Sequence, residues 1–462
     1  MTKRVYRKLN HIHMIGIGGT GMNGIAEVLL NLGYRVSGSD LQENEATRRL
    51  VKLGARIAIG HRAENLENAD VVVISSAVHE DNVEVEKARA GLIPVIPRAE
   101  MLAELMRMKY GVAVAGSHGK TTTTSMTAVV LEAGGFDPTV IVGGRLNTIG
   151  ANAKLGAGDF IVAEADESDR SFLYLSPFIA VLTNIDEEHL DHYRSLDDLK
   201  ETFVNFANKV PFYCPVILCL DDPALQSIIP AIERRLITYG FSAQSDLSAR
   251  DFTFDGFRSA STLLHKGQPL GPLRLQVPGM HNILNAMAAA AVGLDLEIPP
   301  RTILEALESY TGTGRRFELR KTVGGVMVIE DYAHHPTEIK ATLEAAKRGF
   351  DRRVVAVFQP HRYTRLAKLM PVFATAFNQA DVLVLTEVYP AGEDPIPGAT
   401  GQALYEEVRH FGHRNVVFEP DLKKIGPMLQ RILVPGDIVL VLGAGNINKT
   451  IPEIIAGLEE KG

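Results

Sequence analysis

Short apolar runs alternate with helical patterns along most of the 462-residue chain, and glycine or polar residues separate them. Residues 112–115 form one such run, which stops at Gly116, and residues 121–133 have the composition of a helix. Apolar runs this short, bounded by glycine, are typical of strands buried in a sheet. Strands that alternate with helices in this way predict an α/β fold built on parallel sheets.

The apolar runs fall into three groups, which predict three domains, and the chain length favours the same number. Residues 1–108 predict a Rossmann-like parallel sheet, residues 109–313 a P-loop ATPase-like α/β domain, and residues 314–462 a second Rossmann-like α/β domain. The predicted helices are residues 22–32, 99–108, 121–133 and 286–294. The predicted strands are residues 34–37, 71–75 and 95–96 in the first domain, 112–115, 139–142, 160–163 and 179–183 in the second, and 326–329, 354–358, 382–385 and 438–442 in the third.

A glycine motif opens the first domain, between a predicted strand and the helix over residues 22–32. Gly16, Gly18 and Gly21 have the G-x-G-x-x-G spacing, and Asp40 follows about twenty residues later. This is the dinucleotide-binding fingerprint, and taken alone it indicates NAD. Such glycines allow close approach to any pyrophosphate, so other nucleoside diphosphates fit equally well, and a glycine turn without a ligand is the remaining alternative.

A second glycine motif, Gly116-Ser-His-Gly-Lys-Thr-Thr122, lies between strand 112–115 and helix 121–133. In such a turn the backbone N–H groups and the positive end of the helix can cradle a polyphosphate. Lys120 would add a full charge against the outer phosphates, and Thr121 would offer a hydroxyl ligand to Mg²⁺. The usual motif has four residues between its glycines, whereas Gly116 and Gly119 are separated by two. An ordinary strand-to-helix turn is the alternative.

Acidic residues follow the predicted strands 160–163 and 179–183 of this domain, at the sheet edge where α/β proteins bind ligands. Residues 164–169 read Glu-Ala-Asp-Glu-Ser-Asp, and residues 184–192 contain four further acids and two histidines. Such clusters repel themselves unless a cation is bound. The carboxylate of Glu164 suits Mg²⁺, and His189 could supply a nitrogen ligand. A solvated acidic loop is the alternative interpretation.

The predicted strands of the third domain also end in residues that can take part in chemistry. His334 could orient an amine or a phosphate, and Arg362 and Arg365 could form a fork for a carboxylate or phosphate. A solvated arginine-rich turn is the alternative for the two arginines. Before this domain, Asn282 and Asn285 carry amides that could recognise a purine edge, although an N-cap explains one of them equally well.

The composition is that of a globular protein, with 46% hydrophobic residues, 22% charged residues and a net charge of −7. That balance excludes a strongly basic nucleic-acid-binding protein. No apolar run reaches the ~18 residues of a membrane helix, and glycines interrupt the apolar stretch near the N-terminus that could pass for a signal peptide. We therefore expect a cytoplasmic protein without nucleic-acid or membrane partners, in which Cys214 and Cys219 stay reduced.

Taken together, the motifs resemble those of the Mur ligase family. The similar segments, in chain order, are GIGGTGMNGIAEVLLNLGYRVSGSD, AGSHGKTTTT, EADESD, TNIDEEHLDHY, GTGRRF, DYAHHPTE, FQPHRYTR and EVYPAGEDPIPG. The resemblance extends from about His11 to about Lys449 and is to the branch that joins L-alanine to UDP-N-acetylmuramate. It implies a first domain that holds the UDP-sugar, a central ATPase domain, and a third domain that brings the amino acid.

The resemblance further implies ATP and Mg²⁺ as cofactors and a reaction in two steps. ATP would phosphorylate the lactyl carboxylate of the sugar, and the amine of L-alanine would then attack the acyl phosphate. The implied catalytic residues are Lys120, His189, His334, Arg362 and Arg365, and the implied metal ligands are Thr121, Glu164 and His189. The implied ATP contacts are Gly116, Ser117, His118, Gly119, Lys120, Thr121, Thr122, Asn282, Asn285, Arg316 and Asp331, and the implied UDP-sugar contacts are Gly16, Gly18, Gly19, Thr20, Gly21, Asp40, His61, Ser75 and Ser76.

One position departs from part of the family. Several members carry a carbamylated lysine that bridges metal ions, and Asn205 lies near the matching position here. We therefore predict no carbamate, which agrees with the alanine-adding branch. A ligase for a preformed tripeptide, an NAD-dependent oxidoreductase and a non-catalytic nucleotide-binding protein are the alternatives. We expect a monomer or a weak homodimer.

Overall fold

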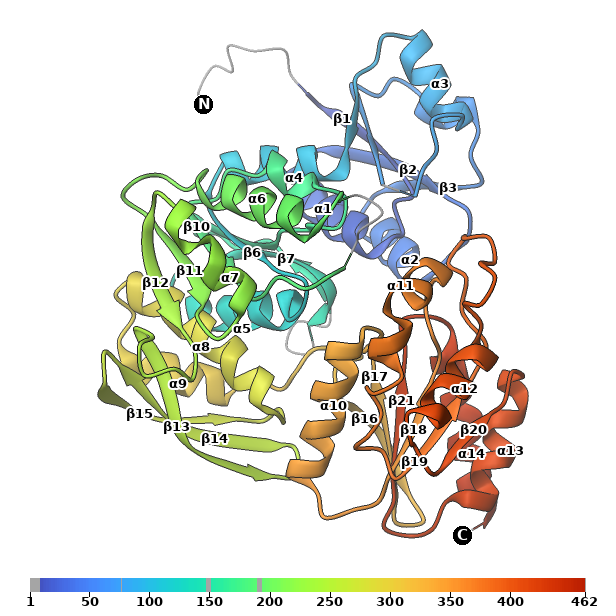
Figure 1. Cartoon of the computed structure of the whole chain (residues 1–462). Helices are drawn as coiled ribbons and strands as arrows, with labels where there is room; N and C mark the ends of the chain where they lie inside the picture. The colour runs from blue at the N-terminus through green and yellow to red at the C-terminus, as the bar shows by residue number, and fades with distance from the viewer. Residues whose placement is uncertain (1–8, 76, 147–150, 189–192, 462) are drawn as a thin grey trace. The chain divides into compact units, whose positions relative to one another are not determined.

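The computed structural model describes residues 9–75, 77–146, 151–188 and 193–461. Its strands form three sheets with helices packed against them, which confirms the predicted α/β class. The chain divides into two compact units (Figure 1). One is built from the chain up to Ser248 together with Leu263–Gly271 and Asn285–Leu307, and the other from Ala249–Thr262, Pro272–Leu284 and the chain from Glu308 onward.

The first sheet has five parallel strands in the order β3-β2-β1-β4-β5. The strand order reverses at β1, because β2 pairs with one side of β1 and β4 with the other. Ligands bind at such switch points, outside the carboxyl ends of the strands, and the first glycine motif follows β1 directly. The elements are β1 (His11–Ile15), α1 (Thr20–Asn31), β2 (Arg35–Asp40), α2 (Glu45–Lys52), β3 (Arg56–Ile59), η1 (Ala63–Leu66), β4 (Val71–Ile74), α3 (Val83–Ala90), β5 (Val95–Pro97) and α4 (Arg98–Arg107).

The second sheet has ten strands in the order β15-β14-β13-β12-β11-β10-β6-β9-β7-β8. Strand β6 lies inside it, in parallel pairing with β10 on one side and β9 on the other. The second glycine motif and both acidic segments therefore leave neighbouring strands at the same edge. The elements are β6 (Tyr110–Ala115), α5 (Lys120–Ala133), β7 (Thr139–Leu146), β8 (Ala151–Lys154), β9 (Phe160–Glu164), η2 (Ser171–Tyr174), β10 (Ile179–Leu182), α6 (Leu196–Ala207), β11 (Pro215–Cys219), α7 (Pro223–Ile228), η3 (Ile229–Ala231), β12 (Arg235–Tyr239), β13 (Leu247–Asp255), β14 (Arg258–His265), β15 (Gln268–Leu275), α8 (Met280–Asp295) and α9 (Pro300–Glu308).

The third sheet has the order β16-β17-β21-β18-β19-β20, and β16 is antiparallel to its neighbour. Successive residues of β17 point to opposite faces, so Ile329 joins the core beneath α10, α11 and α12 while Val328 joins the core beneath α13 and α14. The elements are β16 (Glu318–Val323), β17 (Val326–Asp331), α10 (Pro336–Gly349), β18 (Val354–Phe358), α11 (Tyr363–Phe373), β19 (Val382–Leu385), α12 (Gly401–His410), β20 (Val416–Phe418), α13 (Leu422–Ile432), β21 (Ile438–Leu442), η4 (Ile447–Thr450) and α14 (Ile451–Lys461).

Several elements are longer than the sequence predicts. Strand β17 continues through Glu330 and Asp331, which were expected beyond its end, and both side chains are buried. Helix α8 begins at Met280, so Asn282 and Asn285 lie inside it. The predicted boundaries between three domains stay a prediction. Cys214 and Cys219 are buried and free, as expected, and no helix among the described residues is long and apolar enough to cross a membrane.

Candidate active site

The turn between β6 and α5 has the backbone of a phosphate-binding loop. Gly116 has φ +142° and Gly119 has φ +81°, both of which favour glycine, and Gly119 is the N-cap of α5. A Cβ at Gly116 would lie 2.0 Å from Thr183 Oγ1, and a Cβ at Gly119 would lie 2.7 Å from Asn285 Oδ1. Side chains at these positions would fill the cradle, so the loop fits the polyphosphate predicted for it.

The segment after β10 holds this loop from one side. Asn184 accepts hydrogen bonds from the Ser117 N–H at its backbone oxygen (3.1 Å) and from the His118 N–H at Oδ1 (2.8 Å). Thr183 Oγ1 donates to the His118 carbonyl at 2.6 Å, and His118 Nε2 lies 2.9 Å from an Asp186 carboxylate oxygen. The loop is therefore fixed in shape before any ligand binds.

Lys120 lies in the cradle and contacts a carboxylate from the first acidic segment. Its Nζ is 2.8 Å from Glu167 Oε2 and donates to the carbonyls of Gly116 (2.6 Å) and Ser117 (3.2 Å). Burial opposes a charge on Lys120, yet the carboxylates of Glu167 and Asp166 outweigh it and raise the pKa of Lys120 to about 12. The ammonium is therefore charged at neutral pH, as a phosphate ligand requires.

Glu164 ends β9 beside the loop, where it pairs with Val114 of β6. Thr121 lies in the first turn of α5, so a hydroxyl and a carboxylate follow adjacent strands at one sheet edge. These hard oxygen donors are the type that Mg²⁺ prefers, and the residues present fit that ion. The third predicted ligand, His189, lies outside the described residues.

The first glycine motif surrounds the switch point of the first sheet. The Gly18 N–H donates to Asp40 Oδ2 at 2.8 Å, so this acid fixes the glycine loop itself. Gly16 has φ +76°, and a Cβ there would lie 3.1 Å from Ser75 Oγ. His61 follows β3 at the same edge. Helix α1 begins at Thr20, the Gly19 N–H donates to the Gly16 carbonyl at 3.1 Å, and Ser76 lies outside the described residues.

Arg98 connects the first sheet to the acidic segment within the same compact unit. Its Nη2 is 3.2 Å from Asp166 Oδ2, and a Cβ at Gly21 would lie 3.1 Å from its guanidinium. Burial of Asp166 disfavours its charge, but Lys120 and Arg98 outweigh that effect and lower its pKa. The N-terminal end of α1 and the acidic cluster are thus joined through one arginine.

In the second unit, aromatic and imidazole rings line the ends of the third sheet. His334 lies 5.9 Å from His361, and His361 stacks on Tyr389 at 5.5 Å, measured between ring centroids. Burial, followed by the charges of His334, Arg365 and Arg362, lowers the pKa of His361 to about 3. His361 is therefore neutral at physiological pH, and its Nδ1 lies 3.2 Å from Arg365 Nη1.

The two predicted arginines make separate contacts in this structure. Arg362 has φ +71° at the N-cap of α11, and its Nε donates to Glu393, which also accepts from the Thr364 N–H. Arg365 donates to the His361 carbonyl at 3.2 Å. The predicted role of the two arginines on the alanine carboxylate stays a prediction.

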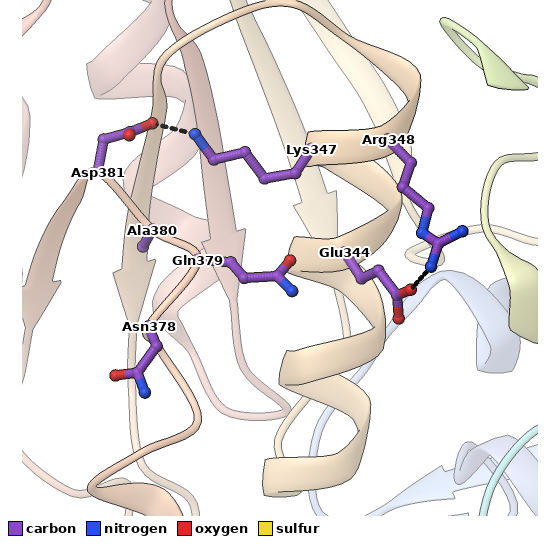
Figure 2. A pocket seen from close by; sticks show the side chains of 7 residues that line it. All are labelled: Glu344, Lys347, Arg348, Asn378, Gln379, Ala380 and Asp381. Atoms are coloured by element: carbon purple, nitrogen blue, oxygen red, sulfur yellow. Dashed lines mark hydrogen bonds and ion pairs between the residues drawn. The ribbon is translucent and has the colours of Figure 1, made fainter.

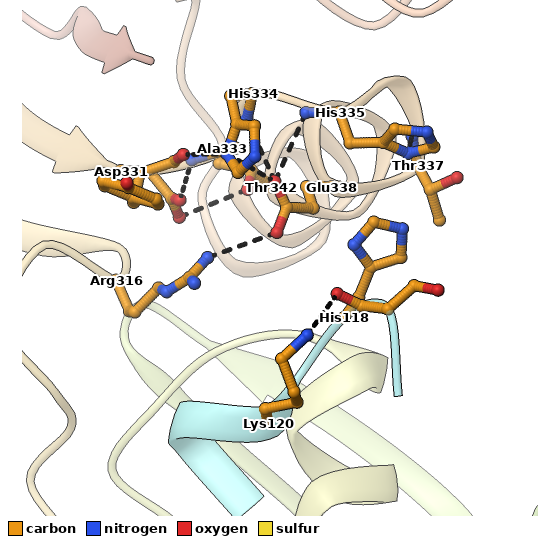
Figure 3. A network of polar contacts seen from close by, with 12 residues as sticks. His118, Lys120, Arg316, Asp331, Ala333, His334, His335, Thr337, Glu338 and Thr342 are labelled. Atoms are coloured by element: carbon orange, nitrogen blue, oxygen red, sulfur yellow. Dashed lines mark hydrogen bonds and ion pairs between the residues drawn. The ribbon is translucent and has the colours of Figure 1, made fainter. Parts of the chain in front are cut away.

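Arg316 and Asp331 belong to a polar network at the start of α10 (Figure 3). Arg316 Nη1 donates to Glu338 at 3.4 Å, and Glu338 also accepts from the His334 N–H at 3.0 Å. Asp331 accepts from the backbone N–H groups of Ala333 and Phe317 and from the Thr342 hydroxyl. Glu338 and Asp331 thus fix the turn that carries His334.

Comparison with known proteins decides the family. Models described as Mur ligase family catalytic domain, Mur ligase middle domain and Mur ligase glutamate ligase domain match residues 11–110, 114–293 and 315–445. A UDP-N-acetylmuramate–L-alanine ligase of Geobacter sp. (strain M21) is 58% identical over 444 residues, which are 96% of each chain. The chain belongs to the Mur ligase family.

Solved Mur ligases share the architecture over nearly the whole chain. The UDP-N-acetylmuramate–alanine ligase of Thermotoga maritima is 30% identical with a TM-score of 0.82, and the match covers 98% of this chain and 100% of that one. A murein peptide ligase of Psychrobacter arcticus is 24% identical with a TM-score of 0.71, covering 97% and 99%. The second likeness shows the fold alone.

Asn285 of this Mur ligase supports the phosphate loop directly. Its Oδ1 accepts a hydrogen bond from Thr123 Oγ1 at 3.1 Å and lies against Gly119, whereas the Asn282 amide donates to the Pro278 carbonyl at 2.7 Å. The predicted contact of both amides with adenine stays a prediction. The Gly119 contact is one that spacing alone did not indicate.

We expect Asn285→Ala to raise the KM for ATP about tenfold, because the loop loses a buried hydrogen bond and a packing partner. Steady-state ADP release measures this. Asn208→Ala is the matched control, since the Asn208 amide bonds the Ala231 carbonyl and makes no contact with the loop among the described residues. An unchanged KM in Asn285→Ala would contradict this role.

Sequence reasoning named the acidic segment but selected Glu164 and not Glu167. His361 lies within the FQPHRYTR segment, but its spacing did not mark it as a site residue. A polar depression of about 410 Å³ lies elsewhere in the second unit (Figure 2). Its charges are already paired, Lys347 with Asp381 and Arg348 with Glu344, so it offers little to a charged ligand.

Proposed function

We propose that this Mur ligase uses ATP to join L-alanine to the lactyl carboxylate of UDP-N-acetylmuramate. The observation that carries the proposal is the 58% identity, over 96% of both chains, to a relative that bears this activity in its name. The phosphate loop with Lys120, the adjacent oxygen donors and the separate glycine loop for a second nucleotide support it. An NAD-dependent oxidoreductase would leave Lys120 and the third sheet without a role.

The proposed reaction has two steps, and each has to overcome repulsion between negative groups. A lactyl carboxylate oxygen attacks the γ-phosphorus of ATP and ADP leaves, which gives an acyl phosphate. The alanine nitrogen then attacks the acyl carbon, loses a proton, and inorganic phosphate leaves. Both steps bring negative groups together, so positioning and neutralisation by fixed charges supply most of the catalysis.

Lys120 supplies the fixed charge beside the outer phosphates, and its pKa ensures that it is charged. Thr121 and Glu164 would hold Mg²⁺, which supplies Lewis-acid neutralisation of phosphate oxygens when bound. Because Glu167 and two carbonyls hold the Lys120 ammonium, a γ-phosphate has to replace some of these contacts. His334 lies in the second unit on a turn fixed by Glu338, where it would face the amine.

ADP release with ATP, Mg²⁺ and UDP-N-acetylmuramate tests the proposal, with L-alanine, the tripeptide or no amine added. Turnover with L-alanine alone is the expected result. Turnover with the tripeptide alone would keep the mechanism and assign the chain to the ligases for a preformed tripeptide. Absence of turnover with either amine would contradict the proposed function. A cytoplasmic location and a monomer or weak homodimer stay predictions.

A further inference from the structure

A buried chain of hydrogen bonds runs through the first sheet to His61. Glu84, at the start of α3, is completely buried, and its two oxygens accept from the Ser39 hydroxyl (2.6 Å), the Asn65 amide (2.5 Å) and the Arg62 N–H (3.1 Å). His13 Nε2 also lies 3.2 Å from Glu84 Oε2. The Ser39 hydroxyl oxygen in turn lies 2.9 Å from His61 Nδ1. Glu84 is thus the final acceptor in this series of hydrogen bonds.

A carboxylate has no hydrogen to donate, and this fixes the direction of the hydrogen bonds that follow. Burial alone would raise the pKa of Glu84, but its hydrogen bonds outweigh burial and lower the pKa to about 2, so the group is ionised at neutral pH. Ser39 has one hydroxyl hydrogen, which goes to Glu84. The Ser39 oxygen can then only accept from His61, so the Nδ1 atom of His61 carries the hydrogen.

We infer that Glu84, acting through Ser39, holds His61 in the Nδ1–H tautomer, so that its Nε2 accepts a hydrogen bond from the sugar nucleotide. The inference rests on the proposed function, because it assigns a role to His61 in binding that substrate. Glu84 and Ser39 are positioning residues, since they act on the ligand through His61.

The location supports this role. The Ser39 carbonyl accepts from the Gly16 N–H (2.8 Å) and the Ile17 N–H (3.1 Å), so the residue that orients His61 also anchors the glycine loop. The His61 side chain is 18% exposed, whereas Glu84 is fully buried. Within the described chain, the hydrogen bonds of the His61 side chain run through Nδ1. Nε2 is left to face a ligand at the carboxyl edge of the sheet.

The tautomer limits what His61 can recognise. In the Nδ1–H tautomer the Nε2 lone pair accepts hydrogen bonds and gains nothing from a phosphate, which also only accepts. The matching groups on UDP-N-acetylmuramate are donors, namely the imide N–H of uracil, the acetamido N–H and the hydroxyls of the sugars. We therefore expect His61 to select for such a donor and not to contribute to the pyrophosphate site.

Nitrogen-15 NMR of histidine-labelled protein reads the tautomer directly. His61→Gln identifies the His61 signals by their loss. We expect the wild-type protein to show Nδ1–H and an unprotonated Nε2 for His61, and Ser39→Ala to lose this preference. In steady-state assays, Ser39→Ala should raise the KM for UDP-N-acetylmuramate roughly three- to tenfold, with the KM for ATP and kcat unchanged.

Ser37→Ala is the matched control. Ser37 lies two residues away on the same strand, and its hydroxyl bonds His13 (2.8 Å) and His11 (2.7 Å) instead of His61. It should leave the His61 tautomer and the KM for the sugar nucleotide unchanged, although it removes a buried hydroxyl from the same network. An equal rise in KM in both variants would show that loss of any buried hydroxyl from this strand perturbs binding, and it would overturn the inference.

Three other results would also overturn it. One is an Nε2–H tautomer in the free enzyme, and another is an imidazolium signal for His61 in the complex with the sugar nucleotide. The third is an unchanged KM in Ser39→Ala. If wild-type enzyme failed to turn over UDP-N-acetylmuramate, the proposed function would fail together with the role in recognition. The NMR spectrum would then still show separately whether Glu84 and Ser39 orient His61.

Discussion

Lys120→Ala is expected to lower turnover about a thousandfold, because it removes a full charge from a preorganised phosphate site. Lys120 is held at the end of the phosphate loop by two carbonyls and by Glu167, so alanine leaves no cation at that position. ADP release at saturating substrates measures the loss. Lys154→Ala is the control, because Lys154 is also ion-paired, with Glu132 and Asp137, and lies on β8. A Lys120→Ala enzyme within tenfold of wild type would refute the assignment of the loop.

The same variant should change how stability depends on pH. Burial raises the pKa of Glu167 to about 7 in the wild type although the Lys120 ammonium opposes that effect, so removal of the ammonium should raise the pKa of Glu167 further. A carboxyl group whose folded pKa exceeds its unfolded pKa stabilises the fold below the unfolded value, and that contribution is lost as the pH rises. Because the wild-type group already has a folded pKa of about 7, the two proteins differ only above that value, and the free energy of unfolding of Lys120→Ala, relative to wild type, should fall as the pH rises above about 7.

Chemical denaturation at several pH values measures this difference. Leaving a buried charge without its partner costs about 3 kcal/mol, so the effect at high pH is measurable. The double variant Lys120→Ala with Glu167→Gln removes the titrating group and should lose most of the added pH dependence. If the double variant kept the full dependence, Glu167 would not be its source.

Much of this site could be predicted because its residues follow strands. The apolar run of β6 and the glycines after it predict the phosphate loop, and parallel strands bring Glu164 to the same edge. Which acid of residues 164–169 reaches Lys120 depends on the path of the chain after β9, and periodicity does not specify that path. Spacing along the sequence therefore could not show that Glu167, and not a neighbouring acid, contacts Lys120.

The network around Glu84 was not predicted from the sequence, for a different reason. Glu84 is 71 residues from His13 and 45 from Ser39 along the chain, and a glutamate is almost never fully buried unless it is paired. Its burial exists only after β1, β2 and α3 have packed together. Glu330 and Asp331 are similar, since charged residues at a strand end are ordinarily exposed, whereas Arg315 and backbone N–H groups allow these two to be buried.

Gly116→Ala should lower ATP-dependent turnover to below about a hundredth of wild type, because backbone strain and a steric clash coincide at this position. The backbone has φ +142°, and the added Cβ would lie 2.0 Å from Thr183 Oγ1 and 3.1 Å from the backbone nitrogen of Asn184. Relieving that clash moves the segment that holds Ser117 and His118. ADP release and calorimetric titration with an ATP analogue measure the result, and a thermal melt confirms that the variant folds.

Gly135→Ala separates the two costs. Gly135 follows the other end of α5 with φ +82°, but a Cβ there meets no atom within 4 Å. It should therefore cost about 1 kcal/mol of stability through backbone strain and leave the affinity for the ATP analogue unchanged. If Gly116→Ala lost no more affinity than Gly135→Ala, the Thr183 contact would not shape the loop. The contacts of Thr183 and Asn184 with the loop would then be a consequence of packing, and Gly116 would be required only for the backbone conformation of the turn.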